Sequence, residues 1–174
     1  EVALALVLLA GAGLVLRGLQ RFAQQDPGWS IDGLTVGTFS LPEKKYGGAA
    51  RQRAFVGTLA DKLANQAGVE RVALAWALPL RPFNTAGSFA IEGRPSPPPG
   101  HAPMRFMNAV TPGYFATLRM TMLAGRDFTA AETAEAPPVT SRNETMARTF
   151  WPNESPLGQR IDGITRMLPS LYRG

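Results

Sequence analysis

The feature that most constrains this chain is an uninterrupted apolar run near its beginning, residues 2–16, with the sequence V-A-L-A-L-V-L-L-A-G-A-G-L-V-L. Arg17 and Arg21 close this run. As a helix, these residues rise about 22 Å, which is less than the roughly 30 Å hydrocarbon core of a bilayer. Because the chain begins with Glu1 rather than Met, inside the run, we expect a cut within a longer transmembrane helix. We therefore assign residues 1–25 to a partial transmembrane helix.

Two other interpretations of the apolar run compete with this one. A buried core helix can contain an apolar run of this length. A signal peptide needs a basic n-region and a small-x-small cleavage site. Residues 10–12, Ala-Gly-Ala, have the composition of such a site, but residues 14–16 continue the run and no basic n-region is present. We rank the transmembrane helix first, the core helix second and the signal peptide third.

Small residues recur along the apolar run. Ala3, Ala10, Gly11 and Gly18 follow one another at spacings that place them close to one face of a helix. Small residues on one face allow two helices to approach closely in lipid. We therefore expect this helix to pack against other transmembrane helices, with the general abundance of Ala and Gly as the alternative explanation.

The net charge of +5 raises the question of nucleic-acid binding. The arginines outside the apolar helix are scattered singly, however, and no aromatic-basic motif of an RNA-binding sheet is present. A solvated basic surface is the simpler interpretation, so we predict no nucleic-acid partner. The chain has no cysteine, which excludes disulfides and thiolate metal sites but does not decide the compartment. The scattered arginines include Arg51, Arg71, Arg94, Arg119, Arg142 and Arg160.

Periodicity predicts a strand, a helix and a second strand in the first half of the soluble part. Residues 34–41 alternate and contain β-branched side chains, so they predict a strand. Residues 49–66 predict an amphipathic helix, for which Gly68 is a suitable C-terminal cap. Residues 69–78 alternate again. Together the three segments predict a right-handed βαβ unit.

The second half predicts short elements separated by turns and proline-rich loops. The expected elements are a short strand over 88–92, an exposed proline-rich loop over 95–103, an extended segment over 104–110, a short helix over 111–118 begun by Thr and Pro, a turn over 125–128, and a helix from Asn143 as its cap to Phe150, ended by Trp151 and Pro152.

Five segments of the chain, taken together, resemble one protein family. They are G-A-G-L-V-L-R-G-L at 11–19, G-V-E-R-V-A-L-A-W-A-L-P-L at 68–80, V-T-P-G-Y-F at 110–115, L-A-G-R-D-F-T at 123–129 and N-E-T-M-A-R-T-F-W-P-N-E-S-P-L-G-Q-R-I at 143–161. In this order they are similar to the MacB-type ABC-transporter permeases, in particular to the duplicated branch that lacks a fused ATPase.

This resemblance implies a bacterial inner-membrane permease fragment with the bulk of the chain in the periplasm. The implied fold is α+β, a transmembrane helix followed by a two-lobed mixed α/β periplasmic domain with a βαβ unit. That domain, residues 26–161, is incomplete. Its implied role is to relay conformational change and to contact a partner or cargo, while ATP is hydrolysed on a separate subunit. The implied partners are membrane lipid, other permease helices or a second permease copy, that ATPase subunit and a periplasmic adaptor.

The chain departs from the family in two places. The family has an apolar strand before the segment at 143–161, whereas Arg142 puts a charge there, so this strand either lies at an edge or is lost. Residues 162–174 do not follow the family, and we interpret them as a divergent tail from a truncated or disrupted frame. In addition, Arg17 and Arg21 would favour a cytoplasmic position for their helix end, although long domains translocate largely regardless of charge.

Sequence motifs for catalysis are absent. There is no phosphate-binding G-x-x-x-x-G-K-[ST] loop and no G-x-S-x-G elbow. His101 is the only histidine, and a triad of His101 with Asp127 and either Ser88 or Ser96 is possible only on paper. We therefore predict a protein that is not an enzyme, with no catalytic, cofactor-binding or metal-binding residues.

Several other residues receive structural rather than chemical interpretations. We expect Arg126 and Asp127 to fix a turn, and Phe150 and Trp151 to lie in the core. The glycosylation sequons at Asn143 and Asn153 are treated as chance matches. Four methionines could ligate Cu(I), but filling an apolar core is their commoner use. They are Met104, Met107, Met120 and Met122.

Overall fold

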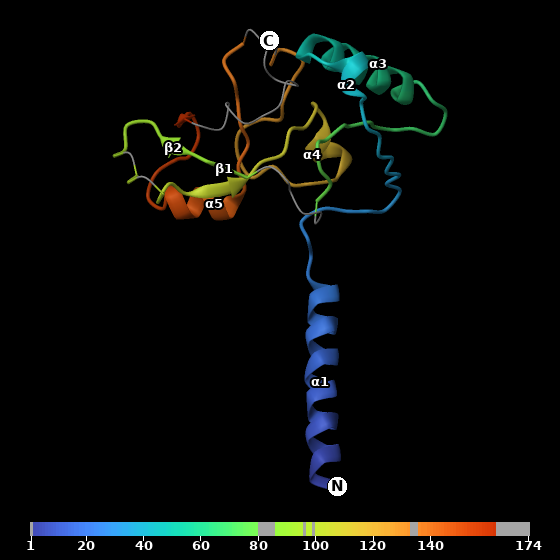
Figure 1. Ribbon diagram of the computed structural model, residues 1–174, viewed down its shortest axis with the longest axis vertical. Helices are drawn as coiled ribbons and strands as arrows, with labels where there is room; N and C mark the ends of the chain where they lie inside the picture. Colours follow the sequence, from blue (N-terminus) through green and yellow to red (C-terminus); the bar gives the residue numbers. More distant parts are fainter. Residues whose placement is uncertain (1, 80–85, 96, 99, 133–135, 163–174) are drawn as a thin grey trace.

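The structure is a computed structural model of the 174-residue chain, and it describes residues 2–79, 86–95, 97–98, 100–132 and 136–162. A long N-terminal helix stands below a small mixed α/β region, as Figure 1 shows. The elements of the described residues are α1 (Val2–Gln24), α2 (Glu43–Tyr46), α3 (Ala49–Ala64), β1 (Ala86–Ser88), β2 (Ala90–Ile91), β3 (Met104–Phe106), α4 (Tyr114–Thr117), α5 (Glu144–Phe150) and β4 (Ile161–Asp162).

Helix α1 projects away from the rest of the molecule (Figure 1). Its 23 residues correspond to a length of about 34 Å, and every one of its side chains is exposed. It is long and apolar enough to cross a membrane, and it is the one described helix that meets this criterion. The interpretation as a core helix is therefore wrong for this structure, because a core helix would bury its apolar side chains.

Helix α3 confirms the amphipathic helix predicted from the sequence. It ends at Ala64, where Asn65 forms the C-cap and its side-chain amide donates to the carbonyl of Asp61 at 2.7 Å. Gly68 is not the cap but turns the chain with a φ of 82°. Helix α3 contacts α2 through Phe55, whose ring centre lies 5.0 Å from that of Tyr46 in α2.

The two strands of the expected βαβ unit do not form. Residues 34–41 are irregular and mostly exposed, and residues 69–78 contain one isolated antiparallel bridge, between Ala75 and Val110. Trp76, within the alternating segment at 69–78, is 47% exposed. A strand requires hydrogen-bonding partners along its length. In the described part of the chain these two segments do not pair with each other, so α3 does not connect two strands.

A side chain extends the bridge between the segment at 69–78 and the later part of the chain. The carboxamide of Asn108 accepts from the N–H of Ala77 at 3.0 Å and donates to its carbonyl at 2.7 Å. On the other side of the bridge, the N–H of Thr111 donates to the carbonyl of Leu74 at 2.9 Å. The Thr111 hydroxyl accepts from the N–H of Leu74 at 2.9 Å. These bonds fix residues 74–77 without a regular sheet.

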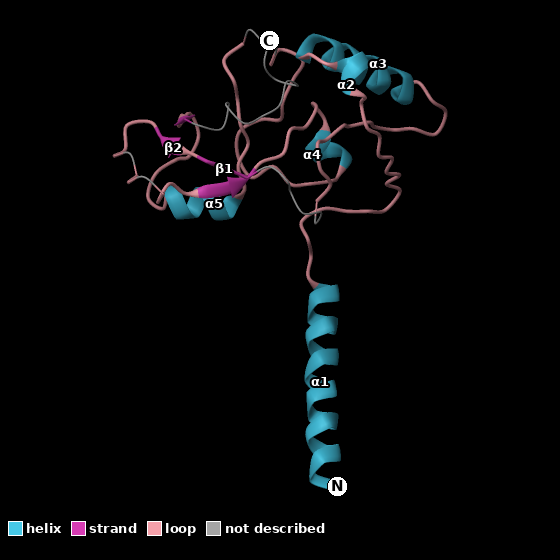
Figure 2. Cartoon of the chain, in the orientation of Figure 1, coloured by secondary structure: helices cyan, strands magenta, loops and turns pink. Residues whose placement is uncertain are grey.

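Two small antiparallel sheets organise the second half (Figure 2). Strand β1 pairs with β3, with Gly87 opposite Arg105, and β2 pairs with β4, with Ile91 opposite Ile161. The strand expected over 88–92 and the extended segment expected over 104–110 thus correspond to short strands. Both sheets are two-stranded, so their stability depends on packing against helices.

The main buried cluster lies around α4. Val110, Tyr114 and Leu118 are buried together, and Tyr114 and Leu118 belong to one helical turn and its end. The helix expected over 111–118 begins later than expected, at Tyr114, because Gly113 adopts a left-handed conformation with a φ of 80°. Partly buried side chains complete the cluster: Trp29, Leu34, Ala73, Phe115, Met120 and Phe128.

Helix α5 matches its prediction closely. The Asn143 side chain accepts a hydrogen bond from the N–H of Met146 at 2.9 Å, as an N-cap does, and Trp151 is the C-cap. The chain thus has an α+β composition with one apolar helix and a small mixed region. The expected division of that region into two lobes is not confirmed by the arrangement of these elements.

Candidate functional site

Two arginines and several aromatic rings surround Trp151. This side chain is only 3% exposed, as expected for a core residue. The guanidinium carbon of Arg142 lies 4.5 Å from the centre of its ring, and that of Arg94 lies 5.5 Å away. Next to Trp151 in the chain, Phe150 packs against Phe89, with ring centres 5.1 Å apart. Trp151 is therefore held between apolar rings and two cations, each within cation–π distance.

Arg142 does not lie in a strand, because residues 136–142 form none. The Arg142 guanidinium instead stacks on Trp151, and its Nη2 donates to the carbonyl of Gln159 at 3.2 Å. Burial lowers the pKa of Arg142, because a shielded environment disfavours the charged form. Cation–π stacking on Trp151 is thus the main contact of the Arg142 side chain given by the structure.

Two donors in this cluster lack acceptors. Nη1 of Arg142 and Nε1 of Trp151 are buried and have no hydrogen-bond partner in the described residues. A buried donor without an acceptor typically costs about 1–3 kcal/mol. Trp151 is therefore held by packing and cation–π contact rather than by its polar atom.

Ion pairs fasten the loop after β2 to the segment that follows α5. Arg94 pairs with Glu154, and Arg160 pairs with Glu92 at 2.8 Å. The backbone N–H of Glu92 also donates to the carbonyl of Arg160 at 3.1 Å. Because all four side chains are substantially exposed, each ion pair contributes little, on the order of 0–1 kcal/mol. Their main effect is to fix the register of β2 against β4.

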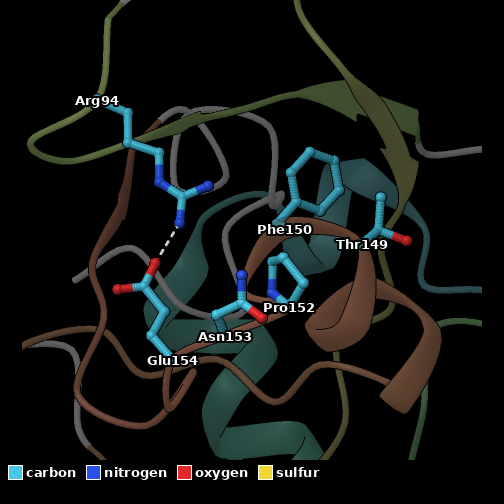
Figure 3. Close-up of a pocket in the computed structure, with 6 residues that line it drawn as sticks. All are labelled: Arg94, Thr149, Phe150, Pro152, Asn153 and Glu154. Carbon is cyan, nitrogen blue, oxygen red and sulfur yellow. Dashed lines mark hydrogen bonds and ion pairs between the residues drawn. The ribbon is translucent and has the colours of Figure 1, made fainter.

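An open hollow of about 500 Å³ lies beside this cluster (Figure 3). The Arg94–Glu154 pair forms one wall, as the dashed line in the figure shows, so the charges in the wall cancel. The Thr149 hydroxyl already donates to the carbonyl of Thr145 at 2.7 Å. The hollow therefore presents neither an activated nucleophile nor a net charge. Its lining residues are Arg94, Thr149, Phe150, Pro152, Asn153 and Glu154.

The members of the hypothetical triad of His101, Asp127 and Ser88 or Ser96 lie in different elements and loops. Ser88 is exposed on β1, and His101 is exposed in the loop before β3. Oδ1 of Asp127 accepts from the N–H of Phe128 at 2.7 Å, and residues 126–128 are irregular rather than a regular turn. Ser96 lies outside the described residues. Among the described residues no group of three or more His, Cys, Asp or Glu side chains is arranged to hold a metal.

The segment that follows Asp127 contains a carboxylate that sequence analysis missed. Glu132 pairs with Arg126, accepts from the Thr129 hydroxyl at 2.7 Å and accepts from the backbone N–H of Thr129. These bonds, from Arg126 first, lower the pKa of Glu132 to about 2. The detectable signal was the pattern T-x-x-E over 129–132, the spacing of a capping box.

Of the four methionines expected to fill an apolar core, Met120 clearly does so. Met120 packs against the buried cluster around α4. Met104 is 60% exposed, and Met122 is also exposed, so these two do not fill the core as expected. Met104 lies on β3, whose three residues are all exposed.

Comparison with known proteins identifies no relative of this chain: no family model, no curated protein and no solved structure matches it. The class that the structure itself defines is therefore coarse. It is a chain with one helix suited to cross a membrane and a small mixed α/β region.

Proposed function

We propose that this chain is part of an ABC-transporter permease, in which α1 anchors a non-catalytic periplasmic domain of the bacterial inner membrane. In this role the domain relays conformational change and contacts a partner or cargo, while a separate subunit hydrolyses ATP. The proposal rests on the five ordered segments that resemble this family and on the long apolar helix that precedes the mixed region.

The exposure of α1 is the observation that carries the proposal. An apolar helix whose every side chain faces outward is unfavourable in water, at roughly 25 cal/mol for each Å² of apolar surface. Lipid removes this cost, and a helical segment satisfies its own backbone hydrogen bonds there. A membrane helix therefore accounts for α1 better than a helix that remains in water.

The soluble part supports a role in contact rather than in chemistry. Its hollow is open and its charged wall is neutralised, and the sequence contains no phosphate-binding loop. A relay domain requires surfaces and a mechanical connection to the membrane helix. The chain leaves α1 and attaches to α4 through the N–H of Ser30, which donates to the carbonyl of Leu118 at 3.0 Å.

Cysteine labelling tests the anchoring and the sidedness together. Since the chain has no cysteine, Ser88→Cys introduces a single exposed thiol in the mixed region, and Val7→Cys introduces one in α1 as the matched control. In intact bacteria, a membrane-impermeant maleimide should label the variant at position 88 and leave the variant at position 7 unlabelled. Labelling at position 88 only after permeabilisation would contradict the periplasmic placement. Recovery of the protein in the soluble fraction, without detergent, would contradict the anchor.

The flanking DNA tests the transporter assignment itself. We expect the full open reading frame, or the frames beside it, to encode a membrane segment with three further helices together with an ATPase or a second copy of this domain. A free-standing frame without these neighbours would contradict transport.

A second candidate is a membrane-anchored interaction module without transport, or a decayed permease gene. Exposed apolar side chains in the mixed region favour the interaction module over a purely structural domain. Leu123 and Leu157 are 68% and 54% exposed, and a Cδ atom of Leu157 lies beside Gly125. Transport by a reconstituted complex that contains this chain would exclude this candidate.

A further inference from the structure

The two arginines of α1 lie near its C-terminal end. Arg17 and Arg21 are four residues apart, so they face the same side of α1, and both are exposed. Arg17 precedes the last helical residue, Gln24, by seven residues, which corresponds to about 10 Å along the axis. With Leu19 and Phe22 beside them, the arginines lie where apolar helix and water-facing chain meet.

No protein carboxylate in the described structure neutralises these two charges. Residues 2–24 contain no Asp or Glu, and neither arginine forms an ion pair with a described acidic side chain. The first acidic residue after the helix, Asp26, instead accepts from the N–H of Gly28 at 2.8 Å. A charge within a membrane helix is costly unless a partner neutralises it or the side chain extends to the interface.

We propose that Arg17 and Arg21 together bind the phosphate of an acidic phospholipid at the end of α1. This proposal rests on the proposed membrane anchoring and adds a ligand class to it. Arginine binds phosphate through several parallel N–H donors, and its long side chain can extend from the helix toward the headgroups. Two arginines on one face offer a net charge that a zwitterionic headgroup satisfies less well than an acidic one. The choice of acidic lipid follows from this charge and from the absence of a described protein counter-ion.

The test compares lipid association of the full chain in nanodiscs with spin-labelled phosphatidylglycerol and phosphatidylcholine. For the native chain, the relative association constant should favour phosphatidylglycerol by about 25-fold, at roughly fivefold for each arginine. The double variant R17Q/R21Q should lose this preference, whereas R17K/R21K should retain most of it. The matched control is R51Q/K62Q, which removes two exposed charges from α3, at the end of the molecule opposite α1 (Figure 1).

Each outcome decides between the site and its alternatives. An unchanged preference in R17Q/R21Q, or an equal loss in R51Q/K62Q, would overturn the lipid site while leaving the anchor intact. Complete competition by inorganic phosphate would overturn the lipid as the ligand in favour of a free anion. If the native chain does not enter the nanodisc at all, the anchoring proposal fails, and the lipid site fails with it.

Discussion

At the scale of single residues, Trp151 shows how ring contacts alone can hold a buried aromatic side chain in place. Its ring contacts Arg142 and Phe150, while its Nε1 has no described acceptor. Removal of the ring leaves a cavity, which costs about 3–5 kcal/mol for Trp→Ala. Phenylalanine keeps part of the ring and removes the buried donor. The structure therefore separates the effect of packing from that of the polar atom.

We predict that Trp151→Ala lowers the free energy of unfolding by about 3–5 kcal/mol and that Trp151→Phe lowers it by less than half as much. Urea unfolding of the full chain in detergent, followed by circular dichroism, measures both. Trp76→Phe, at a side chain that is largely exposed, is the control. Equal losses in the Phe and Ala variants would mean that the Nε1 donor has an acceptor after all.

Glu132 predicts a defined pH dependence. Its pKa falls from the ordinary 4.5 to about 2 in the folded chain, chiefly through Arg126. The ionised form therefore favours the folded state. This stabilisation is complete above the ordinary pKa and is lost as the pH falls from about 4.5 through 2.

Carbon-13 NMR of the Glu132 carboxyl should show this titration near pH 2. Glu132→Gln should make stability less dependent on pH between about 4.5 and 2, whereas Glu70→Gln, at a carboxylate that is 75% exposed, serves as the charge-matched control. A titration midpoint at the ordinary value of 4.5 would show that Arg126 and Thr129 do not hold this carboxylate in solution.

At the scale of elements, α3 is attached through few contacts. Phe55 lies 5.0 Å from Tyr46 and 5.6 Å from Phe39, measured between ring centres. Each such aromatic pair contributes about 0.5–1.5 kcal/mol beyond simple burial. Elements with few buried contacts open locally at a lower free energy than the core does.

We predict that Phe55→Ala lowers the local opening free energy of α3 by about 1–3 kcal/mol, because both aromatic pairs are lost. Hydrogen exchange read by mass spectrometry should show faster exchange in α3 and unchanged exchange in α5. Leu63→Ala, at the exposed end of α3, is the control. Equal acceleration in α5 would mean that the two helices unfold as one unit.

Helix α1 permits a clean test of helix packing in lipid. Apart from its chain neighbours and the nearby backbone of α1 itself, no described atom lies within 4 Å of a Cβ added at Gly11, Gly13 or Gly18. Substitution at these positions therefore disturbs nothing within this chain. Any effect on assembly must come from a partner helix that approaches the small-residue face.

We predict that Gly11→Leu combined with Gly18→Leu weakens association between membrane-embedded chains or with other membrane helices. The stability of the mixed region should change by less than about 0.5 kcal/mol. Energy transfer between labelled chains in vesicles measures association, and Gly13→Leu, about 200° around the helix from Gly11, is the control. Association that survives the double substitution would exclude packing through this face.

The elements that sequence analysis predicted best are those with local signals. The periodicity of residues 49–66 indicates α3, and Asn143 and Trp151 mark the two ends of α5. The strand at 34–41 was wrong because alternation records which side chains are apolar, not whether a partner strand is available. The contact of Arg142 with Trp151 was missed because Arg142 was interpreted as a defect in a strand.

At the scale of the whole molecule, the chain divides by environment. A helix suited to lipid precedes a region whose buried core is small and whose sheets are two-stranded. Sequence analysis predicted this division, because length and composition suffice to recognise an apolar helix. The topology of the mixed region could not be predicted in the same way, since it depends on contacts between residues far apart in the chain.

The hydrogen bonds of Asn108 to Ala77 have a consequence for synthesis. The two residues are separated by 31 positions, so residues 74–77 can form these hydrogen bonds only after the later segment has been translated. At about 5–20 residues per second, this delay amounts to roughly 2–6 s on the ribosome. During that interval the apolar side chains of the earlier segment are open to any chaperone or neighbouring nascent chain.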